Sequence, residues 1–179
     1  MQLPRTIWAE HEVGRFVIPG FIAEFVFRSP HYDRKSPKEV VDFLFVRADQ
    51  SILVSQECRE DPTVKTGMRL QRWTRKSARS AGDRLKGALR WVGTSEEIWC
   101  EHWRRGRVTL MGLPKVTHVM ATIEVKERII LQNDLELVCR ETPITYLSLN
   151  DFLNLCDQLR TGPELVRYIY QRKTLPTEL

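Results

Sequence analysis

The chain lacks long hydrophobic runs, glycine-rich phosphate-binding loops and paired cysteines in its 179 residues. No segment approaches the roughly 18 consecutive apolar residues of a membrane span, and the first residues lead into no apolar stretch of the kind that directs secretion. We therefore predict a cytoplasmic protein without a membrane partner. Its composition, 42% hydrophobic and 28% charged, is typical of a globular protein, and its length predicts a single domain over residues 1–179.

The four cysteines predict neither a disulfide framework nor a zinc centre. They lie far apart, without CxxC spacing or the density of a disulfide-rich domain. One close Cys/His pair exists, but a closed zinc site needs four ligands at set spacings. We expect reduced and mostly buried thiols at Cys58, Cys100, Cys139 and Cys156.

Acidic residues are almost absent from residues 65–90, which contain nine basic residues and one acid, Asp83. The whole chain has 28 Lys and Arg against 23 Asp and Glu, a net charge of +5, so this segment holds more than the entire excess. Apolar or small residues recur in it at three-to-four spacing, which predicts an amphipathic helix over about 68–92. The opposite face of that helix would present Arg69, Arg72, Lys76, Arg79, Lys86 and Arg90.

This stripe of positive charge indicates a surface that binds along the phosphate backbone of a nucleic acid. Solvated helix faces usually interleave both signs and so gain i,i+4 ion pairs. The stripe does so very little, which favours binding to a nucleic acid. The alternative is a solvated face that its charge keeps soluble.

The remaining patterns predict an α/β fold with a central mixed β-sheet flanked by helices. Two apolar runs, 39–46 and 51–58, predict a hairpin around Asp49-Gln50, which would place Asp42 opposite Glu57 on one face. Other elements are expected as helices over 6–13, from Thr94 or Ser95, and after Ser148 and Thr161, and as strands over 108–111, 116–125 and 144–147.

The order of an early acid, Glu24, the segment 38–42, a tight turn, the strand 52–58 and a basic helix is similar to the PD-(D/E)XK restriction-endonuclease-like nuclease superfamily. The resemblance covers about residues 20–92, and the segment 161–169 also looks like the end of such proteins. It implies the superfamily's fold and metal-dependent phosphodiester hydrolysis of nucleic acid, with Mg²⁺ or Mn²⁺ as cofactor.

The resemblance implies metal ligands at Glu24, Asp42 and Glu57. The D/E-x-K triplet aligns either with Ser55-Gln56-Glu57 or with Gln56-Glu57-Cys58, and neither contains lysine. We prefer the first alignment, because it sets Glu57 opposite Asp42. The catalytic residues are then Asp42 and Glu57, with Lys76 of the basic helix taking the lysine role.

Two functions stay open at this stage. One is a metal-dependent nuclease that acts through this altered motif. The other is a catalytically degenerate nuclease fold that serves as a nucleic-acid-binding or protein-interaction module and needs no cofactor. Nucleic acid is the expected partner in both, and a protein partner is compatible with the second.

Overall fold

The computed structural model describes residues 8, 11–14, 24–31, 39–47, 50–58, 67–114, 116–124, 144–159 and 161–172. Its described strands form one seven-stranded mixed sheet of order β5-β4-β1-β2-β3-β6-β7, which confirms the predicted α/β class. Pairing is antiparallel from β5 to β3 and parallel from β3 to β7. The strands are β1 (Val26–His31), β2 (Phe43–Arg47), β3 (Gln50–Glu57), β4 (Glu97–His102), β5 (Gly106–Met111), β6 (Val116–Ile123) and β7 (Ile144–Ser148).

The β2–β3 hairpin forms as predicted, but its register was wrong by two residues. Arg47 pairs with Gln50 and Phe43 with Val54, so the hairpin is centred one residue earlier in the sequence than a turn at Asp49-Gln50. Continuing this register places Asp42 against Ser55, not against Glu57. Side chains alternate along a strand, however, and a shift by an even number keeps each residue on its face. Asp42, Ser55 and Glu57 therefore still share one side of the sheet.

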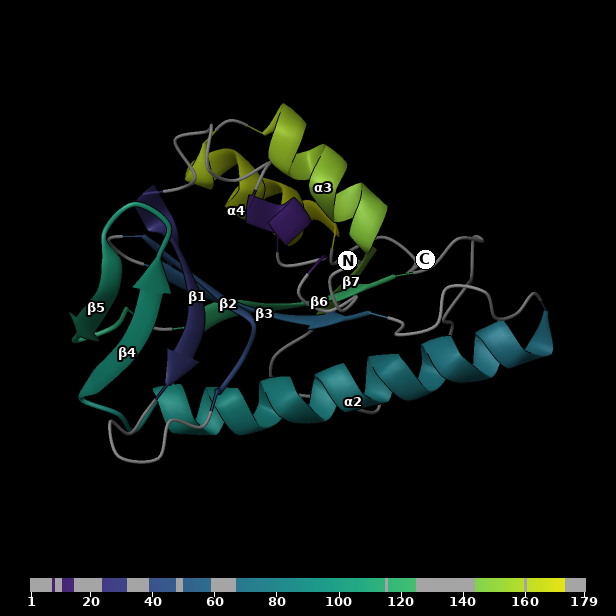
Figure 1. The fold of residues 1–179 in the computed structure, drawn as a ribbon, viewed down its shortest axis with the longest axis horizontal. Coiled ribbons are helices and arrows are strands. Elements are labelled where there is room, and N and C mark those ends of the chain that lie inside the picture. The colour runs from purple at the N-terminus through teal and green to yellow at the C-terminus, as the bar shows by residue number, and fades with distance from the viewer. Residues whose placement is uncertain are drawn as a thin grey trace.

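Helix α2 (Met68–Val92) confirms the predicted basic helix and crosses one face of the sheet (Figure 1). It begins after Gly67, whose φ of 66° suits a glycine. Small side chains on its inner face let the helix lie close to β3 and β6, and this layer contains Leu44, Leu53 and Val119. The buried residues of α2 are Leu70, Thr74, Ser77, Ala78, Ala81, Gly82, Leu85, Ala88 and Val92.

Strand β4 corrects the prediction of a short helix from Thr94 or Ser95. The two glutamates at 96 and 97 suit a helix N-terminus, but Ile98, Cys100 and His102 are buried in strict alternation. This period of two matches a strand, and β4 pairs with both β1 and β5. Sheet pairing therefore outweighs the local helix signal.

Strand β1 was not predicted, because Ser29-Pro30 resembles the start of a loop. The strand includes both residues, with Ser29 at a φ of 47° and an irregular register between Arg28 and His31. An irregularity of this kind accommodates a proline within a sheet.

Helices α3 (Leu149–Gln158) and α4 (Gly162–Arg172) cover the other face of the sheet (Figure 1). Both start where predicted. The Ser148 hydroxyl accepts a hydrogen bond from the Asp151 amide at 3.0 Å, and Thr161 and Glu164 form a reciprocal capping box. Trp8 and residues 11–14 are helical, in agreement with the predicted N-terminal helix, whose remainder lies outside the described residues. No helix within the described ranges is long and apolar enough to span a membrane.

Candidate functional site

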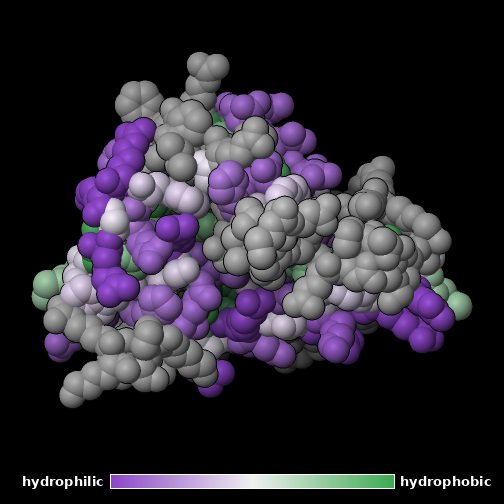
Figure 2. All heavy atoms as spheres, viewed as in Figure 1, coloured by the Kyte–Doolittle hydropathy of each residue, from purple (hydrophilic) through white to green (hydrophobic). Residues whose placement is uncertain are grey.

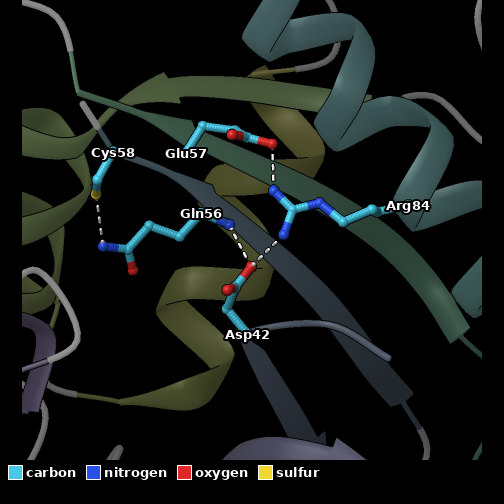
Figure 3. A network of polar contacts seen from close by, with 5 residues as sticks. All are labelled: Asp42, Gln56, Glu57, Cys58 and Arg84. Atoms are coloured by element: carbon cyan, nitrogen blue, oxygen red, sulfur yellow. Dashed lines mark hydrogen bonds and ion pairs between the residues drawn. The ribbon is translucent and has the colours of Figure 1, made fainter. Parts of the chain in front are cut away.

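A polar cluster forms where β2, β3 and α2 meet. Asp42 precedes the first residue of β2, and Glu57 is the last residue of β3. Because side chains alternate along a strand, Asp42 and Glu57 lie on the same face of the sheet as Leu44 and Leu53. These two leucines pack in the layer under α2. Arg84 reaches the same place from α2, so three elements contribute one charged group each (Figure 3).

Arg84 bridges the two carboxylates. Its guanidinium donates a hydrogen bond to Oε1 of Glu57, and Nη1 lies 3.9 Å from Oδ2 of Asp42. The Gln56 amide also donates to Oδ2 of Asp42 at 2.6 Å, whereas the Gln56 side chain turns away to Sγ of Cys58, 3.3 Å from its Nε2 (Figure 3). The acids are largely shielded, with side chains 16% and 18% exposed, while Arg84 is 43% exposed.

Burial raises the pKa of Asp42 from an ordinary 3.8 to about 6, because it penalises the charged carboxylate. The Gln56 amide, Arg84 and the Ser55 hydroxyl lower this pKa, and the charge of Glu39 raises it further. Burial also lowers the pKa of Arg84, but Asp42 and Glu57 outweigh it and leave that pKa above its usual value. The guanidinium thus stays charged, while Asp42 titrates just below neutral pH.

Glu24 lies at the opposite end of the strands from Asp42. The Ser29 amide of β1 donates to the Asp42 carbonyl, and Val26 pairs with Phe45. Glu24 lies in a helical turn two residues before β1, beyond Val26, and Val26 itself is three residues, or roughly 10 Å, along β1 from Ser29. Glu24 instead forms an ion pair with Arg104 at 2.6 Å. The structure therefore does not bring the three expected acids together.

Lys76 also lies outside the polar cluster. It is exposed on α2, eight residues and about 12 Å along the helix axis from Arg84. Sequence reasoning missed Arg84 because it was one of many basic residues. A signal was present: Arg84 follows the buried Ala81 by three residues and precedes the buried Ala88 by four, so it lies at the edge of the core-facing stripe.

The cluster does not fit a divalent cation as it is arranged. Mg²⁺ takes oxygen ligands in near-octahedral geometry, yet Oε1 of Glu57 is held by Arg84 and Oδ2 of Asp42 by Gln56. The Glu57 carbonyl accepts a hydrogen bond from the Glu124 amide at 2.9 Å. Nowhere in the described part of the chain do three or more His, Cys, Asp and Glu side chains gather in a group that could hold a metal ion.

The outer face of α2, which we define by the six predicted cations, points away from the sheet. Five of the six residues are exposed and Lys86 is half-buried, while the buried residues of the helix lie on the opposite side. Hydrophilic side chains are visible at the lower right of the molecule, where α2 lies, and also on its left side (Figure 2). The six residues are Arg69, Arg72, Lys76, Arg79, Lys86 and Arg90.

No protein-family model matches the chain, and no curated protein matches its sequence. Among solved structures, the small subunit of the heterodimeric restriction endonuclease R.BspD6I is similar, with a TM-score of 0.50 and 13% sequence identity. The match covers 94% of this chain and 81% of that one. A likeness at this identity concerns the fold alone, and the chain has a restriction-endonuclease-like fold.

Proposed function

We propose that the chain is a nucleic-acid-binding module built on a restriction-endonuclease-like fold, and that the outer face of α2 is its binding surface. The observation that carries the proposal is the run of six cations along one side of a 25-residue helix whose other side is fixed to the sheet. A rigid row of Lys and Arg neutralises phosphates and releases their counterions. Contacts of this type position a protein on nucleic acid without reading bases.

The similar solved structure supports this assignment. It belongs to a restriction endonuclease, and a nucleic acid is the ligand on which such an enzyme acts. That protein is also one subunit of a heterodimer, which supports a protein partner for this chain as a secondary proposal. Of the two functions that the sequence leaves open, the site therefore best supports the second, a catalytically degenerate nuclease fold that binds nucleic acid.

Binding of a labelled duplex, measured by fluorescence anisotropy in EDTA, tests the proposal. We expect Arg72→Glu combined with Lys76→Glu to weaken binding about tenfold or more at low salt. The matched control combines Arg107→Glu with Arg167→Glu, two exposed residues outside α2, and changes the net charge equally. Equal weakening by both pairs would show that net charge, not the outer face of α2, determines binding.

Metal-dependent hydrolysis is the second candidate, and one observation favours it. Asp42 and Glu57 lie on one side of adjacent strands and converge on a single cationic group. Mg²⁺ or Mn²⁺ would have to compete with Arg84 for these oxygens, and neither Glu24 nor Lys76 lies in the cluster. Cleavage of DNA or RNA in the presence of Mg²⁺ or Mn²⁺ that Asp42→Asn abolishes would make hydrolysis the function. If the substrates stay intact in both ions, nucleic-acid binding is the function that remains.

A further inference from the structure

A cation of the chain itself contacts the Asp42 and Glu57 carboxylates. Two carboxylates at one shielded site repel each other, and a positive charge that contacts both offsets this repulsion. Their side chains are 16% and 18% exposed, so water screens them only in part. The chain supplies the positive charge itself, from the middle of α2.

We propose that the Arg84 guanidinium takes the place of a divalent cation between Asp42 and Glu57, so that the cluster in the native protein binds no Mg²⁺ or Mn²⁺ and becomes a divalent-cation site only when Arg84 is removed. The inference concerns the inner side of α2. It is independent of the nucleic-acid binding proposed for the outer face, which is measured in EDTA.

The position of Arg84 on the helix keeps the guanidinium in place. Leu85 and Ala88, one and four residues after Arg84 in the same helix, are buried, so the backbone that carries Arg84 cannot withdraw without opening the core. The planar fork of an arginine also matches carboxylate oxygens better than an ammonium group does. Arg84 contacts both acids at once, and its competitor would have to displace it from both.

Electrostatic repulsion argues against a metal ion and Arg84 occupying the cluster together. Asp42 and Glu57 contact Arg84, and the charge of Glu39 also acts on both Asp42 and Arg84. A divalent ion bound beside Arg84 would place two cations within a few ångströms of each other, where they repel strongly. Arg84 and a divalent cation are therefore mutually exclusive occupants.

Thermal unfolding with MgCl₂ or MnCl₂, against NaCl at equal ionic strength, tests this exclusion. We expect no ion-specific change in Tm for the wild type. Arg84→Gln is expected to unfold at a lower temperature in EDTA and to gain about 3 °C or more in about 10 mM Mg²⁺, if the ion binds with a Kd of about 1 mM or below. Adding Asp42→Asn to Arg84→Gln should remove the gain.

Arg79→Gln is the matched control, because it removes an arginine from the exposed side of the same helix and should leave Tm insensitive to the choice of ion. Ion-specific stabilisation of the wild type that Asp42→Asn abolishes would overturn the proposal. A folded Arg84→Gln variant that gains nothing from either ion would also overturn it. Should that variant not fold in EDTA, the wild-type titration still decides, since it needs no substitution at Arg84.

Discussion

The backbone amide of Gln56 lies 2.6 Å from Oδ2 of Asp42 and donates a hydrogen bond to it. This contact joins the end of β3 to the residue before β2, and it stabilises the ionised carboxylate. Burial nevertheless dominates, because the pKa of Asp42 ends at about 6. The folded protein therefore binds a proton at this site more tightly than the unfolded chain does.

The raised pKa of Asp42 has a definite sign for stability. Between about pH 4 and pH 6 the native state carries more of the proton than the unfolded state, so this group lowers the free energy of unfolding as pH rises through that window. Asp42→Asn is neutral at every pH and keeps an acceptor for Gln56. We expect it to raise the free energy of unfolding by about 1 to 3 kcal/mol at pH 8 and to have little effect near pH 4.

Urea unfolding of wild type and Asp42→Asn at both pH values measures this difference. Asp157→Asn, on the exposed side of α3, makes the same chemical change away from the cluster and should show no such pH-dependent gain. Destabilisation by Asp42→Asn at pH 8 would contradict the account, since it would mean that the contacts of the carboxylate outweigh its burial.

The inner side of α2 should contribute strongly to stability through Leu85, which is fully buried between the helix and the sheet. Leu85→Ala removes buried methyl groups and leaves a cavity, and we expect it to cost about 2 to 5 kcal/mol. Met68→Ala, at a helix residue that is 73% exposed, should change the free energy of unfolding by less than about 0.5 kcal/mol. Similar losses in the free energy of unfolding for the two variants would contradict the packing of Leu85 between α2 and the sheet.

Ser148 caps α3 through its hydroxyl, which accepts from the Asp151 amide at 3.0 Å. Ser148→Ala leaves that amide without its partner and should lower the free energy of unfolding by about 1 kcal/mol. Ser148→Thr keeps the hydroxyl and should recover most of the loss. If chemical unfolding gives equal losses for both variants, the effect comes from packing around Ser148 and not from the cap.

The elements with a strong period could be predicted from the sequence. Helix α2 follows from apolar and basic residues at three-to-four spacing, and β6 from its nearly continuous apolar run. The starts of α3 and α4 follow from Ser148 and Thr161, because capping is a local interaction between residues three apart. Each of these features depends on neighbours in the chain.

Features that depend on tertiary partners could not be predicted. The hairpin register depends on whether Arg47 pairs with Gln50, as observed, or Ala48 with Ser51, as predicted, and the sequence favours neither strongly. Strand β4 was taken for a helix because its pairing with β1 is not local. Glu24 was grouped with Asp42 by its order in the resemblance, whereas its position depends on how β1 runs beside β2.

The dependence on tertiary partners also explains why the role of Arg84 could not be predicted. Its partners lie 42 and 27 positions away in the sequence, at Asp42 and Glu57. Helical spacing places Arg84 at the edge of the buried side of α2, but only the fold places two acids opposite it. The polar cluster thus contains the expected pair of acids with an unexpected cation.

The salt dependence of duplex binding by the wild-type protein tests the central claim most directly. Neutralisation of one phosphate by each of the six cations of the outer face of α2 predicts a slope of log Kobs against log salt of about −5, at about −0.9 per phosphate. Arg72→Glu combined with Lys76→Glu should reduce the magnitude of that slope by about 2 or more. A slope near zero, or one that the double substitution leaves unchanged, would contradict the account.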